Sequence, residues 1–111
     1  MFDSELPFEI TVADLHTWRT GNRPHRLIDV RQVHEHDLCR IEGADLLPLH
    51  ELPTRTGEVD RETLTVIYCH HGARSGKAVM YLRQQGYEIV TNLRGGINAW
   101  SLEVDPSVPR Y

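Results

Sequence analysis

Short apolar runs recur along the chain and alternate with stretches in which apolar residues repeat at helical spacing. A short apolar run bounded by turn residues is typical of a strand buried on both faces of a sheet. We expect strands at residues 8–10, 27–30, 44–47, 64–68 and 87–91. We expect helices at residues 11–19, 33–39, 75–85 and 97–102, a helical turn at 50–52 and charged turns at 53–60. Strands that alternate with helices predict an α/β fold, with a central, mostly parallel sheet of about five strands and helices on both faces.

Residues that start and stop helices stand at the edges of these segments. Thr11 is a suitable N-cap for the first helix, with Asp14 near its third position. Gly86 is placed to end the helix at 75–85. Residues 103–111 predict an extended strap or a frayed tail after a core at about 8–102. Residues 1–111 are therefore expected to form one domain.

The composition narrows the choice of partners. The 111 residues are 40% hydrophobic, which is ordinary for a soluble domain, and carry a net charge of −4. Twelve Lys and Arg against sixteen Asp and Glu leave no broad basic face by count, which argues against nucleic acid as a partner. No apolar run approaches the ~20 residues of a membrane span, and the first residues lack the pattern of a signal peptide. We therefore expect a cytoplasmic protein with no membrane partner.

The two cysteines stand in different contexts. Cys39 and Cys69 lie thirty positions apart without a Cys-x-x-Cys pattern, which disfavours a disulfide scaffold and the common thiol-disulfide oxidoreductases. Cys39 falls near the end of a predicted helix, where a structural role is expected. Cys69 ends the strand at 64–68 and faces the amino terminus of the next helix, which is where ligands bind in open α/β sheets.

The loop after Cys69 is suited to bind an anion and to make the Cys69 sulfur reactive. Its backbone N–H groups and the helix dipole attract negative charge and favour a thiolate over a thiol. His70, His71, Arg74 and Lys77 add local positive charge. One segment thus offers both a nucleophile and a place for a negatively charged substrate.

Four segments in register resemble the motifs of rhodanese-like sulfurtransferases. The segment Cys69-His-His-Gly-Ala-Arg-Ser75 resembles the active-site loop of that family. The other three are Leu27-Ile-Asp-Val-Arg31, Ile41-Glu-Gly-Ala44 followed by Leu47-Pro48, and Leu93-Arg-Gly-Gly-Ile-Asn-Ala-Trp100. Together they span nearly the whole chain, as in a single-domain member. The resemblance therefore implies the rhodanese-like variant of the α/β fold.

The resemblance also implies a reaction. The Cys69 thiolate would take a sulfane sulfur from thiosulfate or another persulfide donor, and a cyanide, thiol or protein-thiol acceptor would then remove it. Gly72 lets the backbone turn tightly, and Arg74 would neutralise the anionic donor. Ser75 would cap the following helix and form hydrogen bonds within the loop. The expected binding residues are His70, His71, Gly72, Ala73, Arg74 and Ser75. No metal or other cofactor is required.

Loop length separates the nearest alternatives. Four residues lie between Cys69 and Arg74, the sulfurtransferase count, whereas related phosphatases and arsenate reductases resemble each other in having five. A second alternative is a sulfur-relay or interaction module that receives sulfur from a protein partner. The chain departs from the family's usual His-x-Pro-Gly-Ala middle motif by carrying Glu42 in place of the proline. The histidines after Cys69 replace the small residues that many members have.

Several other residues have structural explanations as well as functional ones. Asp29 and Arg31 follow a neighbouring strand and are expected to brace loops around the pocket by hydrogen bonds. His34 and His36 match no structural zinc spacing, so they are interpreted as surface histidines and no metal site is expected. Arg94 either lines the entrance or is solvated, with even odds.

Overall fold

The parallel sheet brings the carboxyl ends of its strands together at one edge. The structure, a computed structural model, describes residues 6–111, and all pairings in its five-stranded sheet are parallel, in the order β1-β5-β4-β2-β3. The strands are β1 (Glu9–Ile10), β2 (Arg26–Asp29), β3 (Asp45–Leu46), β4 (Thr65–Tyr68) and β5 (Val90–Leu93). Since all run in the same direction, their carboxyl ends meet at one edge. The predicted fold class is confirmed.

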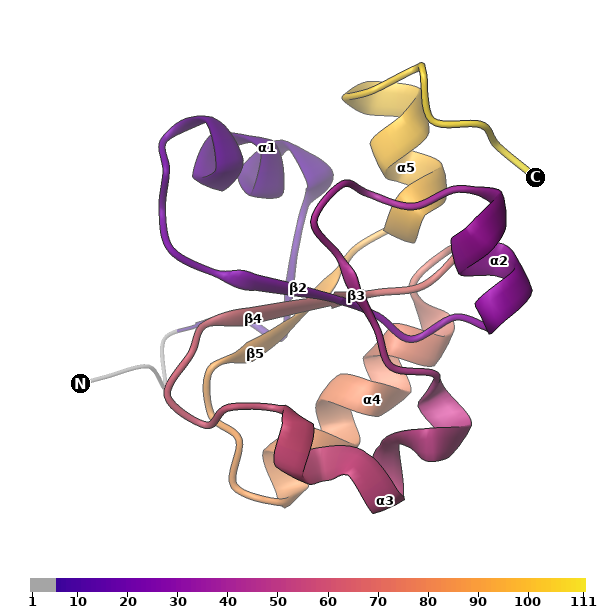
Figure 1. The fold of residues 1–111 in the computed structure, drawn as a ribbon. Helices are drawn as coiled ribbons and strands as arrows, with labels where there is room; N and C mark the ends of the chain where they lie inside the picture. The colour runs from indigo at the N-terminus through magenta and orange to yellow at the C-terminus, as the bar shows by residue number, and fades with distance from the viewer. Residues whose placement is uncertain (1–5) are drawn as a thin grey trace.

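Helices cover both faces of this sheet (Figure 1). The α-helices are α1 (Val12–Thr20), α2 (Val33–Leu38), α3 (Leu52–Arg55), α4 (Ala73–Gln84) and α5 (Gly96–Glu103), with short 3-10 turns η2 (Leu49–Glu51) and η3 (Thr56–Glu58). In the described part of the chain, none of these helices has the length and apolar character needed to cross a membrane. Figure 1 shows α1 and α5 on one side of the sheet and α3 and α4 on the other.

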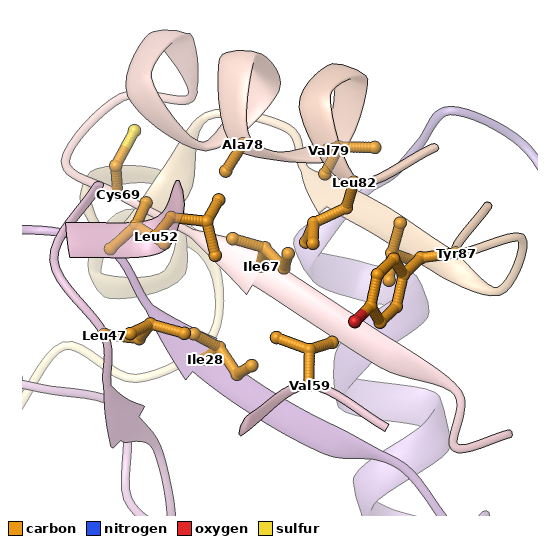
Figure 2. Close-up of a cluster of buried hydrophobic side chains, with 12 residues drawn as sticks. Ile28, Leu47, Leu52, Val59, Ile67, Cys69, Ala78, Val79, Leu82 and Tyr87 are labelled. Atoms are coloured by element: carbon orange, nitrogen blue, oxygen red, sulfur yellow. The ribbon is translucent and has the colours of Figure 1, made fainter. Parts of the chain in front are cut away.

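Alternate residues of the central strand enter two separate cores. Ile67 of β4 packs into a cluster with α4, which also contains Cys69, as Figure 2 shows. Val66 and Tyr68 face the opposite way and pack with residues of α1 and α5. This alternation follows from the period of two in a strand. It explains why the run before Cys69 is apolar throughout, since both of its faces are buried.

The predicted helix at the amino-terminal side is confirmed in detail. Thr11 is the N-cap of α1, its hydroxyl accepts from the N–H of Asp14, and the Asp14 carboxylate accepts from the N–H of Thr11 in return. Two such reciprocal bonds satisfy donors that the helix itself leaves free. The remaining predicted strands and helices near 8–10, 27–30, 33–39, 44–47, 64–68 and 97–102 are present, with ends shifted by one residue or a few.

Three boundaries differ from the sequence prediction. The last strand was predicted at 87–91 but runs over Val90–Leu93, because Tyr87 is used in the core and donates its hydroxyl to the carbonyl oxygen of Thr56 at 2.9 Å. Residues 53–60 were predicted as turns but include the end of α3, where Pro53 in the first turn needs no N–H partner. Helix α4 starts at Ala73 rather than residue 75, because Gly72 already turns the chain in the left-handed region.

Candidate active site

Cys69 lies directly after β4 at the carboxyl edge of the sheet. Its side chain is buried, with 1% of the residue exposed, and Figure 2 shows it at one end of the core, beside α4. The chain turns at Gly72, with φ of +113°, a conformation that a residue with a Cβ rarely adopts. This turn directs the Gly72 N–H at the Cys69 sulfur, with 3.0 Å between N and Sγ. The predicted role of Gly72 as the turning residue is confirmed.

Ser75 contacts the sulfur from within the first turn of α4. Its Oγ lies 3.3 Å from Cys69 Sγ, 3.3 Å from the Gly72 carbonyl oxygen and 2.5 Å from Oδ1 of Asn92. A hydroxyl has one proton to donate, so an ionised sulfur competes for it with the two oxygens. The predicted hydrogen bonding of Ser75 within the loop is confirmed. The prediction that Ser75 caps the helix is wrong, because Gly72 occupies the N-cap position and α4 has no side-chain cap.

Asn92 was not among the predicted site residues. It is 3% exposed on β5, and its Nδ2 donates to the Gly72 carbonyl oxygen at 3.3 Å. The shifted strand explains the omission, since the predicted strand ends at residue 91 and leaves residue 92 outside it. Its position just before a double-glycine motif is the signal that could have identified it.

The amino terminus of α5, where the double glycine lies, anchors the first peptide groups of the Cys69 loop. The N–H of Ile97 donates to the carbonyl oxygen of Cys69 at 2.9 Å, and the N–H of Asn98 donates to that of His70 at 3.1 Å. Gly95 and Gly96 have φ of +77° and +59°. A helix amino terminus leaves its first N–H groups without partners inside the helix. Here two of them fix the loop, while the Gly72 N–H remains directed at the sulfur.

Arg74 is paired with a glutamate from α2. Its Nη1 and Nη2 donate to Oε1 and Oε2 of Glu35 at 2.7 and 2.9 Å. The hydrogen bonds from Arg74 hold the pKa of Glu35 well below its usual range, and those to Glu35 raise the pKa of Arg74. Both Nη atoms are thus engaged within the protein, and Glu35 was not predicted as a site residue. Anion binding by Arg74 stays a prediction, whereas its link between α4 and α2 is observed.

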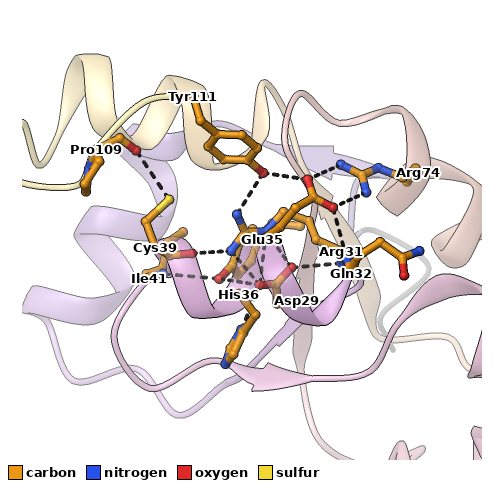
Figure 3. Close-up of polar contacts among 11 residues, drawn as sticks. Asp29, Arg31, Gln32, Glu35, His36, Cys39, Ile41, Arg74, Pro109 and Tyr111 are labelled. Carbon is orange, nitrogen blue, oxygen red and sulfur yellow. Dashed lines mark hydrogen bonds and ion pairs between the residues drawn. The ribbon is translucent and has the colours of Figure 1, made fainter.

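Asp29 and Arg31 form the buried base of the same polar network (Figure 3). Both side chains are fully buried, with 2.7 Å between Arg31 Nη2 and Asp29 Oδ2. The same Nη2 donates to the carbonyl oxygen of Cys39 at 2.6 Å, and Asp29 Oδ2 lies 2.9 Å from Nδ1 of His36. These bonds brace the segment between β2 and β3. The prediction of His36 as a surface residue is wrong, because the Asp29 carboxylate gives it a buried partner and only 8% is exposed.

The two histidines after Cys69 lie against each other. The rings of His70 and His71 have their centroids 3.9 Å apart, and the ring of Tyr111 lies 3.9 Å from the other side of His70. Burial, followed by the proximity of His71, lowers the pKa of His70. His71 and Ala73 are exposed at the surface of the loop. His70 is therefore favoured in its neutral form more strongly than an exposed histidine.

The other residues considered from sequence lie away from the sulfur. Cys39 follows α2, packs in the opposite core from Cys69, and places its Sγ 3.3 Å from the carbonyl oxygen of Pro109. Arg94 is largely exposed and pairs with Glu9, with 2.6 Å between Nε and Oε2. Over residues 6–111, no cluster of three or more His, Cys, Asp and Glu side chains is arranged to hold a metal ion.

Known proteins are similar to this chain in sequence and in fold. The family model of the rhodanese-like domain matches residues 11–103. A protein of Allochromatium vinosum named sulfurtransferase is 48% identical over 75 residues, covering 68% of this chain and 70% of that protein. The probable adenylyltransferase/sulfurtransferase MoeZ of Mycobacterium tuberculosis is 33% identical over 92% of this chain, which spans 26% of that protein. The crystal structure of a rhodanese-related protein from Thermoplasma volcanium superposes with a TM-score of 0.82 at 28% identity, covering 95% of this chain and 100% of that one.

The chain therefore belongs to the rhodanese-like domain family. The family match and the sulfurtransferase names of its relatives support sulfur-transfer activity in general. The Cys69 loop, β2 and the double-glycine motif, which carried the resemblance in the sequence, meet at one edge of the sheet in the structure.

Glu35→Gln is expected to lower the free energy of unfolding by about 1–2 kcal/mol near neutral pH, because Arg74, whose side chain is 34% exposed, loses its ionised partner. Pairing with Arg74 lowers the pKa of Glu35 in the folded protein. The ion pair therefore contributes fully to the free energy of unfolding above the unfolded-state pKa of about 4.3, and this contribution is lost as the pH falls toward the folded-state pKa. Denaturant unfolding of both proteins from about pH 7 to about pH 2 should show the difference closing on the acid side.

Glu58→Gln is the matched control for this measurement. Glu58 pairs with Arg55 on the surface, with 2.7 Å between Oε2 and Nε, and an exposed pair contributes little to stability. A loss of stability in Glu35→Gln that is as small as the loss in Glu58→Gln, or that is constant across the pH range, would contradict a stabilising role for the Glu35–Arg74 pair.

Proposed function

We propose that this rhodanese-like protein moves a sulfane sulfur from thiosulfate or a persulfide donor to a thiophilic acceptor through a persulfide on Cys69. The observation that carries the proposal is the contact of Cys69 Sγ with the Gly72 N–H at 3.0 Å and the Ser75 hydroxyl at 3.3 Å, at the amino terminus of α4. Both groups lie where they can donate hydrogen bonds to a sulfur that carries negative charge during the transfer. The amino terminus of α4 adds a partial positive charge on the same side.

The reaction proceeds in two displacements at sulfur. The Cys69 thiolate attacks the outer sulfur of thiosulfate, the sulfur–sulfur bond of the donor breaks, and sulfite leaves with the bonding electron pair. An acceptor such as cyanide or a thiolate then attacks the outer sulfur of the Cys69 persulfide. The sulfur–sulfur bond to Cys69 breaks, the product leaves with the transferred sulfur, and the thiolate is restored. Splitting one transfer into two steps in this way is covalent catalysis.

The short loop supports sulfur over a phosphate or arsenate as the group bound beside Cys69. Helix α4 begins at Ala73, so the loop turns back toward the helix at Gly72. A phosphatase or arsenate reductase activity is correspondingly disfavoured. Phosphate-ester hydrolysis that depends on Cys69 would revive it.

A relay function, in which another protein supplies the sulfur, is the second candidate. The observation that favours it is the similarity to MoeZ, named as a probable adenylyltransferase/sulfurtransferase, in which the matched part is 26% of the protein. In that relative the matched part stands beside other sequence that could provide a partner. The test compares sulfur acceptance from a persulfide on a cysteine-desulfurase-type protein with acceptance from thiosulfate. A much faster rate from the protein donor would favour the relay.

The persulfide is tested by mass spectrometry of the protein after incubation with thiosulfate. We expect a mass gain of about 32 Da, one sulfur atom, on the peptide that contains Cys69, since covalent catalysis requires this intermediate. Cys39→Ser is the matched control and should retain the adduct. Absence of the adduct under conditions of turnover, or its location on Cys39, would contradict the proposal.

A further inference from the structure

The chain after α5 folds back toward the reactive loop. Val104 and Val108 pack against the core cluster to which α5 contributes, and the hydroxyl of Ser101 donates to the carbonyl oxygen of Val108 at 2.5 Å. The predicted strap is thus held to the domain rather than frayed. It brings Tyr111 to the polar network at the site, where Figure 3 shows dashed lines from its hydroxyl to Arg31 and to Glu35.

The Tyr111 hydroxyl joins two parts of this network. It accepts from Nη1 of Arg31 at 2.8 Å and donates to Oε2 of Glu35 at 2.7 Å. The same Glu35 oxygen accepts from Nη2 of Arg74 at 2.9 Å. A continuous series of hydrogen bonds therefore runs from the buried Arg31 through Tyr111 and Glu35 to the first turn of α4. Arg74 stands next to Ser75, which contacts the sulfur.

The Tyr111 ring contacts the loop at a second point. It stacks on His70, with centroids 3.9 Å apart and 6° between the ring planes. His70 is thereby held between Tyr111 and His71, and its Nε2 is shielded from water and has no hydrogen-bond partner among residues 6–111. His70 is also the residue that follows Cys69. One side chain thus touches the residue after the nucleophile and the ion pair at the start of α4.

We propose that Tyr111 is a positioning residue for the Cys69 loop, acting through His70 with its ring and through Glu35 and Arg74 with its hydroxyl. The inference deepens the proposed sulfur transfer and rests on it. The ring restricts His70 to one orientation, and the hydroxyl holds the Glu35 carboxylate where Arg74 can use both of its Nη atoms. Small displacements of a reacting group have large effects on rate.

The pKa of His70 reports on its contact with the Tyr111 ring independently of catalysis. The charged and titratable groups that face His70 are His71, Tyr111, Glu35, Arg74 and Arg31. Burial is the main cause that lowers the pKa of His70. Removal of the Tyr111 ring admits water to His70, so its pKa should rise toward the ordinary value of about 6.5.

The test compares Tyr111→Leu, which removes both contacts, with Tyr111→Phe, which keeps the ring and removes the hydroxyl. We expect kcat with thiosulfate to fall about tenfold in Tyr111→Leu and about threefold in Tyr111→Phe, with a smaller change in KM. In NMR titrations, the pKa of His70 should rise in Tyr111→Leu and stay near the wild-type value in Tyr111→Phe. Tyr87→Phe is the matched control, because the Tyr87 hydroxyl donates to the Thr56 carbonyl oxygen at 2.9 Å away from the loop, and it should leave kcat and His70 unchanged.

Two results would overturn the proposal. One is a Tyr111→Leu protein whose kcat equals that of the wild type, and the other is a His70 titration that does not change in Tyr111→Leu. If the wild-type protein transfers no sulfur, the proposed function fails, and the His70 titration by itself then decides whether Tyr111 positions the loop.

Discussion

Replacement of Cys69 by serine is expected to abolish sulfur transfer from thiosulfate to cyanide, with a loss of at least about 10³-fold in kcat/KM. A serine hydroxyl at this position forms no persulfide, so the first displacement has no nucleophile that can carry the sulfur. The Gly72 N–H and the Ser75 hydroxyl would remain in place, 3.0 and 3.3 Å from the position of Sγ, but without a reacting group. Thiocyanate formation measures the loss.

Cys39→Ser is the control, because Cys39 belongs to the opposite core and contacts the carbonyl oxygen of Pro109 rather than the loop. It should retain near wild-type turnover. Circular dichroism and thermal unfolding of both variants show whether the fold is kept. Equal thiocyanate formation by the wild type and a folded Cys69→Ser protein would remove Cys69 from the mechanism.

Gly96→Ala is expected to lower kcat/KM about 10²-fold by displacing the loop that holds Cys69. A Cβ at residue 96 would collide with the carbonyl oxygen of Cys69 and would lie 2.5 Å from that of His70. These are backbone atoms that also accept the N–H groups of Ile97 and Asn98, so they have no room to move without breaking the anchoring bonds. The φ of +59° at Gly96 adds backbone strain of about 1–2 kcal/mol for alanine.

Gly43→Ala is the control that separates the effect of backbone strain from the effect of the collision at Gly96. Gly43 has φ of +87°, also in the left-handed region, but a Cβ there would meet nothing within 4 Å. This variant should lose a similar amount of stability to backbone strain and keep its activity. Steady-state kinetics and thermal unfolding of the two variants provide the comparison. Equal activities in the two alanine variants would show that close approach at Gly96 does not position the loop.

The Cys69 loop was predictable because the residues that define it are close together in sequence. Cys69, the turn at Gly72 and the four-residue spacing to Arg74 are adjacent in sequence, and a buried strand followed by a helix places them together. The α/β fold was predictable for the same reason, since short apolar runs alternate with helical segments. Boundaries were less accurate where an apolar side chain serves packing rather than strand pairing, as at Tyr87.

The residues that support the loop could not be assigned in the same way. Glu35 is separated from Arg74 by 39 positions and Tyr111 from Glu35 by 76. Asn92 is 17 positions from Ser75, and its contact depends on the strand ending at Leu93. A glutamate on a short helix or a tyrosine in a strap has many possible partners. Only the packing of α2, α4 and the strap around one sheet edge selects them.

The sequence by itself thus indicated the candidate nucleophile and determined the length of its loop and the class of fold, because each depends on neighbouring residues and on the pattern of apolar positions. The tertiary structure decided how the loop is held. It directed the N–H groups of Ile97 and Asn98, at the start of α5, to the carbonyl oxygens of Cys69 and His70, and it engaged Arg74 with Glu35. These are contacts between distant segments, whose partners are fixed only when the parallel strands bring their carboxyl ends to one edge.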